Sequence, residues 1–191
     1  YEKGDLDAAI RALPPHRRDE RRCLAALARG KKPAQAARAV PKRLRLFLIS
    51  ALQSHLFNEV LDARLPDLDL LEPGDLAWKH DSGAVFKVED VEAENARAAR
   101  FEVSPSGPMF GYKMIAPEGR PGEVEAKVLG EAGLTPESFR RPGGLKVKGA
   151  RRPLRVPLGE AGVTEDGPDL ILIFTLPPGS YATVVTAEVM K

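Results

Sequence analysis

Residues 47–58 read FLISALQSHLFN and form the centre of the strongest helical pattern in the chain. Apolar side chains recur there at every fourth position, at Leu48, Leu52, Leu56 and Val60. This spacing is typical of one face of an α-helix. Pro41 suits the first turn, so the pattern predicts a helix from Pro41 to about Leu65. Because its central turns are apolar nearly all round, we expect this helix to be buried on several sides.

The segment before this helix is rich in Ala, Arg and Leu and predicts short helices. One stretch begins at Gly4 and ends at Pro14, and a similar stretch begins at Gly30 and ends at Pro41. Proline breaks a helix from within, so each proline marks the end of its helix.

The segment after residue 65 changes to short strands, turns and helices. We expect strands over residues 75–79, 84–88, 151–156 and 169–176, and helices over residues 90–99 and 121–133. Residues 104–111 are dense in Gly and Pro and predict a loop. A final helix is expected to begin with Ser180 as its N-cap. These elements predict an α+β fold.

The overall composition is that of a chain with a hydrophobic core. The 191 residues are 43% hydrophobic and 29% charged, which suits one large domain or two unequal pieces. The longest apolar runs, 46–49 and 170–174, are too short to cross a bilayer. Cys23 is the only cysteine, which excludes a disulfide or a thiolate metal site within the chain. We therefore expect a cytoplasmic protein without a membrane partner.

The small net charge of +2 hides blocks of opposite sign. Residues 1–64 hold 14 basic and 7 acidic side chains, residues 65–138 hold 7 and 15, and residues 139–191 hold 8 and 5. Such blocks suit a positive face for a polyanionic partner, although many solvated surfaces have the same pattern.

Hydrolytic, metal and dinucleotide chemistry find no support in the sequence. His16, His55 and His80 lack the spacing of metal ligands, and no HExxH, CxxC or nucleophile-elbow motif occurs. The glycine patterns of P-loops and dinucleotide sites are absent as well. We expect no metal and no cofactor.

A basic segment between residues 140 and 155 contains no acidic side chain. Its cations are Arg140, Arg141, Lys146, Lys148, Arg151, Arg152 and Arg155. Cations that neutralise phosphates release counterions, so this segment predicts contact with RNA. The alternative is a solvated loop.

A second distinctive segment is FTLPPGSYAT at residues 174–183, which leads from an apolar strand into a helix. Its tight turn places free backbone N–H groups beside the ring of Tyr181. Aromatic rings stack on extruded bases, and helix N-termini attract phosphate. The alternative for Tyr181 is an anchor in the core, and for Ser180 a simple helix cap.

Four motifs in order give the chain a resemblance to the tRNA pseudouridine synthase D family. The motifs are FLISALQSHLFN at 47–58, SGPMFG at 106–111, GARRPLR at 149–155 and LPPGSYAT at 176–183. They resemble the family's long-helix motif, glycine-rich loop, paired-arginine motif and carboxy-terminal signature.

The resemblance implies two domains. Residues 1–153 would be most of a family-specific insertion domain, mostly helical with short strands. Residues 154–191 would be the last strands and helix of a pseudouridine synthase domain, whose sheet is mixed or antiparallel. The two domains form a cleft for transfer RNA, and no obligatory protein partner is implied. The reaction converts a uridine in the D-stem region, position thirteen, to pseudouridine without a cofactor.

The resemblance also assigns roles to individual residues. Tyr181 matches the aromatic residue that stacks on the target uracil, with Gly179 and Ser180 shaping the turn. Asn58 belongs to the long-helix motif on the cleft. Arg151 and Arg152 either reach the phosphates or brace the domain junction. The family's catalytic aspartate lies in a Gly-x-x-Asp-Lys-like motif that this sequence does not contain, so we expect the chain alone to be inactive.

Two further hypotheses remain beside that of an enzyme fragment. One is a stand-alone RNA-binding module without catalysis. The other is a structural or protein-interaction domain whose basic face is incidental, which would bind RNA weakly and with a shallow salt dependence.

Overall fold

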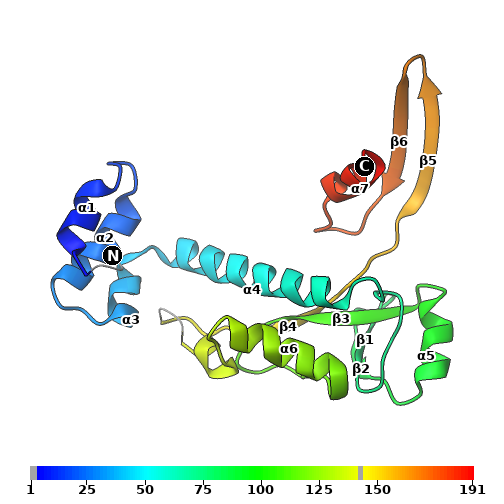
Figure 1. Cartoon of the computed structure of the whole chain (residues 1–191), viewed down its shortest axis with the longest axis horizontal. Coiled ribbons are helices and arrows are strands. Elements are labelled where there is room, and N and C mark those ends of the chain that lie inside the picture. Colours follow the sequence, from blue (N-terminus) through cyan, green and yellow to red (C-terminus); the bar gives the residue numbers. More distant parts are fainter. Residues whose placement is uncertain (1–3, 142–143) are drawn as a thin grey trace. The chain divides into compact units, whose positions relative to one another are not determined.

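The computed structural model describes residues 4–141 and 144–191 (Figure 1). The chain forms two compact units. The first comprises the chain up to Ala63, together with Gly107–Ala116 and Gly122–Arg152. The second comprises Arg64–Ser106, Pro117–Pro121 and Pro153–Lys191. The described elements are helical and antiparallel β, which confirms the α+β class.

The first unit begins with the expected short helices. They are α1 (Leu6–Ala12), α2 (Arg18–Ala28), α3 (Pro33–Ala36) and the 3₁₀ turn η1 (Ala37–Ala39). Asp5 caps α1, because its carboxylate accepts a hydrogen bond from the Ala8 N–H at 2.8 Å. Arg21 of α2 donates to the carbonyl groups of Ile10 and Leu13 and so joins α2 to the end of α1. The sequence pattern did not separate α2 from its neighbours.

The long helix α4 (Lys42–Arg64) is present as predicted, but its burial is not (Figure 1). Phe47 and Leu48 are 66% and 54% exposed, whereas Leu56 and Val60 are buried. The expectation of burial on several sides is therefore wrong for the first half of the helix. Only the second half joins the core of the unit, which consists of Leu56, Val60, Phe110, Val128, Leu129 and Phe139.

The other side of this core comes from α6 (Gly119–Glu131) and the 3₁₀ turn η2 (Pro136–Phe139). Helix α6 confirms the prediction for residues 121–133, and Gly133 beyond its end has a φ of +66°. The chain at Gly111 passes so close to Gly149 that a Cβ at Gly111 would overlap the Gly149 backbone. This contact needs glycine.

The second unit contains most of a four-stranded sheet, in the order β2-β1-β3-β4. Its strands are β1 (Leu76–Lys79), β2 (Val85–Lys87), β3 (Val103–Met109) and β4 (Ala150–Pro153). Strand β1 pairs antiparallel with β2 and with β3, and Trp78 lies opposite Ser104. Helix α5 (Val91–Ala98), capped by the Asp90 carboxylate, adds Ala98 to a core with Leu71, Ala77, Val88 and Val103.

Strand β3 overturns the prediction of a loop over residues 104–111. All seven residues of β3 are buried, despite the sequence Ser-Pro-Ser-Gly-Pro. The Ser106 hydroxyl donates to the Leu76 carbonyl at 2.6 Å, and the Leu154 N–H donates to the Pro105 carbonyl at 2.9 Å. Tertiary pairing thus overrides the local preference of Gly and Pro for turns.

The last part of the second unit is a two-stranded antiparallel sheet followed by a helix (Figure 1). It consists of β5 (Gly159–Asp166), β6 (Asp169–Thr175) and α7 (Ala182–Val189). The sequence predicts β6, but it predicts no strand over residues 159–166, where the structure has β5. Apolar side chains on or beside these elements are more than half exposed: Val163, Leu170, Ile173, Val184, Val189 and Met190. No helix in the described part of the chain combines the length and apolar character needed to cross a bilayer.

Candidate nucleic-acid interface

The basic segment divides into exposed and internal cations. The exposed ones are Arg140, Arg141, Lys146, Lys148 and Arg152. The segment is fixed beside residues 112–113, because the N–H groups of Tyr112 and Lys113 donate to the carbonyls of Val147 and Lys148 at 3.0 Å. These exposed cations can reach a phosphate backbone without breaking a buried contact.

Arg140 takes up a defined position within this segment. Its guanidinium carbon lies 4.9 Å from the centroid of the Tyr112 ring, which is within the range of a cation–π contact. Its Nε lies 2.6 Å from a carboxylate oxygen of Glu137, which raises the pKa of Arg140. The group stays cationic at any physiological pH.

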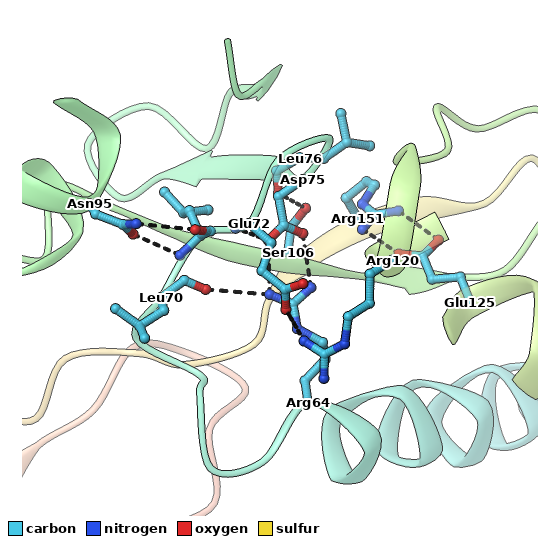
Figure 2. Close-up of polar contacts among 11 residues, drawn as sticks. Arg64, Leu70, Glu72, Asp75, Leu76, Asn95, Ser106, Arg120, Glu125 and Arg151 are labelled. Atoms are coloured by element: carbon cyan, nitrogen blue, oxygen red, sulfur yellow. Dashed lines mark hydrogen bonds and ion pairs between the residues drawn. The ribbon is translucent and has the colours of Figure 1, made fainter. Parts of the chain in front are cut away.

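Arg151 is an internal residue of the first unit (Figure 2). Its side chain is 4% exposed and makes a bidentate ion pair with Glu125, with N–O distances of 2.7 and 3.0 Å. Planar guanidinium and carboxylate groups match each other in this geometry. The contact fixes β4 to α6 within the first unit, and the two predicted roles of Arg151, at the phosphates or at the domain junction, stay predictions. Nothing in the sequence pattern had pointed to Glu125 as its partner.

Arg155 is partly buried in the second unit. Its Nε donates to the Ser104 hydroxyl at 3.1 Å, and its Nη2 donates to the Ala98 carbonyl at 2.6 Å. The guanidinium also lies 4.2 Å from the centroid of the Phe101 ring. Burial lowers the pKa of Arg155. His80 lies nearby, with its Nε2 2.8 Å from Ser104 Oγ. Burial and the positive charge of Arg155 lower the pKa of His80.

A buried ion-pair network in the second unit was not predicted from the sequence (Figure 2). Arg64 and Asp75 have side chains 3% and 1% exposed, and two N–H groups of Arg64 donate to the two Asp75 oxygens at 2.9 and 2.8 Å. Glu72 lies 3.6 Å from Arg64 Nε and also pairs with Arg120. The Glu72 N–H donates to Asp75. These charges are satisfied internally, which indicates a structural role.

The carboxy-terminal turn presents Tyr181 to solvent. Its side chain is 76% exposed, and the Ser180 N–H donates to the Pro177 carbonyl at 3.2 Å across the turn. Gly179 has a φ of +90°, a conformation that glycine adopts without strain. The N-cap of α7 is Tyr181, so the prediction of Ser180 as the cap is wrong. Asn58 is exposed on α4.

Metal chemistry has no candidate among the described residues, since no three His, Cys, Asp or Glu side chains lie together as ligands would. The candidate groups of the first unit are the exposed cations of the basic segment and the buried Arg151, and those of the second unit are Arg155 and the exposed ring of Tyr181.

The model of the tRNA pseudouridine synthase D (TruD) family matches residues 1–189. This chain belongs to that family. It is 49% identical over 192 residues to the tRNA pseudouridine synthase D of Geobacter metallireducens, with 100% of this chain and 48% of the relative covered. It is 47% identical over 150 residues to the enzyme of the same name from a strain of Thermus thermophilus, with 78% and 40% covered.

A solved TruD structure agrees with the fold. The crystal structure of a protein described as a putative tRNA pseudouridine synthase D from Methanosarcina mazei superposes with a TM-score of 0.76 at 28% identity. The match covers 96% of this chain and 47% of that chain. The chain thus spans about half the length of the curated TruD relatives it matches.

Proposed function

We infer that this chain is the carboxy-terminal part of a tRNA pseudouridine synthase that converts a uridine in the D-stem region of transfer RNA to pseudouridine. The observation that carries the proposal is the TruD family match over residues 1–189, together with relatives named for this activity. The enzyme acts in the cytoplasm, and transfer RNA is its partner.

The proposed domain boundary lies at residue 153. Residues 1–153 are most of the insertion domain, and residues 154–191 are the carboxy-terminal part of the catalytic domain. The exposed apolar side chains of β5, β6 and α7 support this assignment. A two-stranded sheet is marginally stable by itself in water, and more strands with a common apolar face are needed to stabilise it.

The reaction breaks the bond between C1′ of the ribose and N1 of uracil and forms a bond from C1′ to C5. The C5 proton is lost and N1 gains one, so no cofactor or net hydrolysis is needed. The catalytic aspartate implied by the family resemblance does not belong to these 191 residues. The role of this chain is to bind the RNA and to support the extruded base.

Tyr181 is the residue proposed to stack on the target uracil. Its ring is exposed, and it follows the turn at Gly179. A base extruded from its stack loses its neighbours, and an aromatic face replaces them. Arg151 and Arg155 position the backbone through their internal contacts, while the exposed cations of the basic segment hold phosphates.

Replacing Tyr181 by alanine should weaken RNA binding or turnover by about 1–3 kcal/mol, the range for one base stacked on an aromatic ring. The measurement is kcat/KM on a tRNA transcript, with this chain joined to the amino-terminal part of the Geobacter metallireducens relative. Tyr181→Phe is the matched control and should retain activity, because stacking uses the ring. An equal kcat/KM for the alanine variant and the parent would contradict the proposed stacking role of Tyr181.

Binding of the chain to transfer RNA should weaken steeply with salt. We expect log K to fall by about 0.7–0.9 per phosphate contact for each unit of log[salt]. Lys146→Gln and Lys148→Gln should each lower that slope by about one. Lys191→Gln, which removes one charge far along the chain from the basic segment, should leave the slope unchanged. A shallow salt dependence of tRNA binding by the parent chain would favour the hypothesis of a structural or protein-interaction domain whose basic face is incidental.

A further inference from the structure

The first unit contains an apolar cavity that the proposed reaction does not use. Its volume is about 320 Å³, and its main apolar lining is Phe110, Tyr112, Met114, Ala126, Leu129 and Leu134. Thr135 and Pro136 also line the cavity and are exposed, so it reaches the surface. Ligand pockets span roughly 300–1,000 Å³. The volume of this cavity lies at the lower limit of that range and suits one small group.

The walls of the cavity are held in place. Glu125 of α6 lines it and is fixed by the bidentate pair with Arg151. Phe110 and Leu129 belong to the buried core of the unit, and Gln53 of α4 donates to the Phe110 carbonyl at 2.6 Å. A preformed recess binds a ligand without an ordering penalty for its walls.

Positive charge borders the same recess. Arg140 lies over the ring of Tyr112, a lining residue. Lys113 stands between two lining residues, and its N–H pairs with the Lys148 carbonyl, which brings the basic segment alongside. Lys113, Arg140 and Lys148 are all exposed. The combination of an apolar recess, an aromatic wall and a cationic border is complementary to a base that is attached to phosphates.

We propose that this cavity binds one unstacked nucleobase of the RNA, other than the target uridine, while the basic segment holds the adjoining phosphates. The inference rests on the proposed function, because it takes RNA as the partner. The Tyr112 ring in the wall provides stacking, and Arg140, which lies over that ring, adds positive charge beside it. The site selects RNA with an unpaired base over a continuous duplex, whose bases stay stacked.

Filling the recess tests the inference. Ala126 is an exposed residue of α6 that lines the cavity, and Leu has nearly the same helix propensity as Ala. We expect Ala126→Leu to weaken binding of the chain to a tRNA transcript about tenfold, within the range of one stacked base, and to leave the salt slope unchanged. The matched control is Ala96→Leu on the exposed face of α5, which should bind as the parent does.

Methyl NMR of the parent chain provides a second test that needs no variant. Adding a short single-stranded RNA should shift the signals of Met114 and Leu129, and double-stranded RNA of equal charge should not. An unchanged affinity of the Ala126→Leu variant for tRNA would overturn this inference and leave the proposed function intact. So would methyl signals that respond to an apolar peptide and not to RNA. If the parent shows no salt-dependent binding of tRNA, the proposed function fails as well.

Discussion

Purified by itself, the 191-residue chain should form no pseudouridine in transfer RNA, whereas the same chain completed by the amino-terminal part of a TruD relative should do so. The physical reason is that the chain holds candidate binding groups but not the aspartate motif of the family. Enzymes accelerate their reactions by about a millionfold or more, and loss of the essential group removes nearly all of this. The difference between the two proteins should therefore be all or none.

The measurement is the release of tritium from tRNA that carries 5-tritiated uridine, because the C5 hydrogen leaves when C5 bonds to the ribose. The completed protein with Tyr181→Phe serves as a positive control for the carboxy-terminal part. Activity of the chain alone would place a catalytic residue within it and refute the assignment. A completed protein that binds tRNA but releases no tritium would instead favour the stand-alone RNA-binding module.

Replacing Asp75 by alanine should destabilise the second unit by about 3–5 kcal/mol, because it leaves the Arg64 guanidinium buried without its main counterion. The two side chains are 1% and 3% exposed, so water cannot compensate for the loss. Trp78 is the only tryptophan of the chain and lies on β1, three positions after Asp75. Its fluorescence during urea unfolding therefore reports on this unit directly.

An exposed ion pair of the same unit is the control. Lys87 and Glu118 are 49% and 69% exposed, and Lys87→Ala should change the free energy of unfolding by less than about 1 kcal/mol. The double replacement Arg64→Met with Asp75→Leu should recover much of the lost stability, since it removes both charges together. Equal effects of Asp75→Ala and Lys87→Ala would mean that the buried pair does not stabilise the unit.

Local sequence patterns predicted the helices well and the strands less well. Helix α4 has a four-residue apolar repeat, and α6 ends before a glycine at positive φ, so each carries its own signal. Strand β3 has no such local signal, because its Pro and Gly residues favour turns. Pairing with β1 makes it a strand. Burial of α4 was also misjudged, since an apolar face does not reveal which part of it meets a partner within the chain.

The candidate site was predictable in composition but not in geometry. The sequence shows seven cations between residues 140 and 155, and they look equivalent. Arg151 differs from the exposed cations because it pairs with Glu125, which is 26 positions away in the sequence. Arg155 differs from them because it donates to Ser104, which is 51 positions away. Such distant partners have no local signature. The stacking role of Tyr181 and the RNA contacts stay predictions until they are measured.

The hairpin of β5 and β6, whose apolar side chains are exposed, is expected to pair late in folding. During synthesis, amino-terminal parts of a protein fold first, so the preceding half implied by the family resemblance has time to fold before this hairpin is made. On the proposed assignment, the hairpin would pair with a sheet that has already formed. This pairing joins residues far apart in the sequence. Long-range pairing of this kind is slow. Pairing of this hairpin would then decide when the enzyme becomes active.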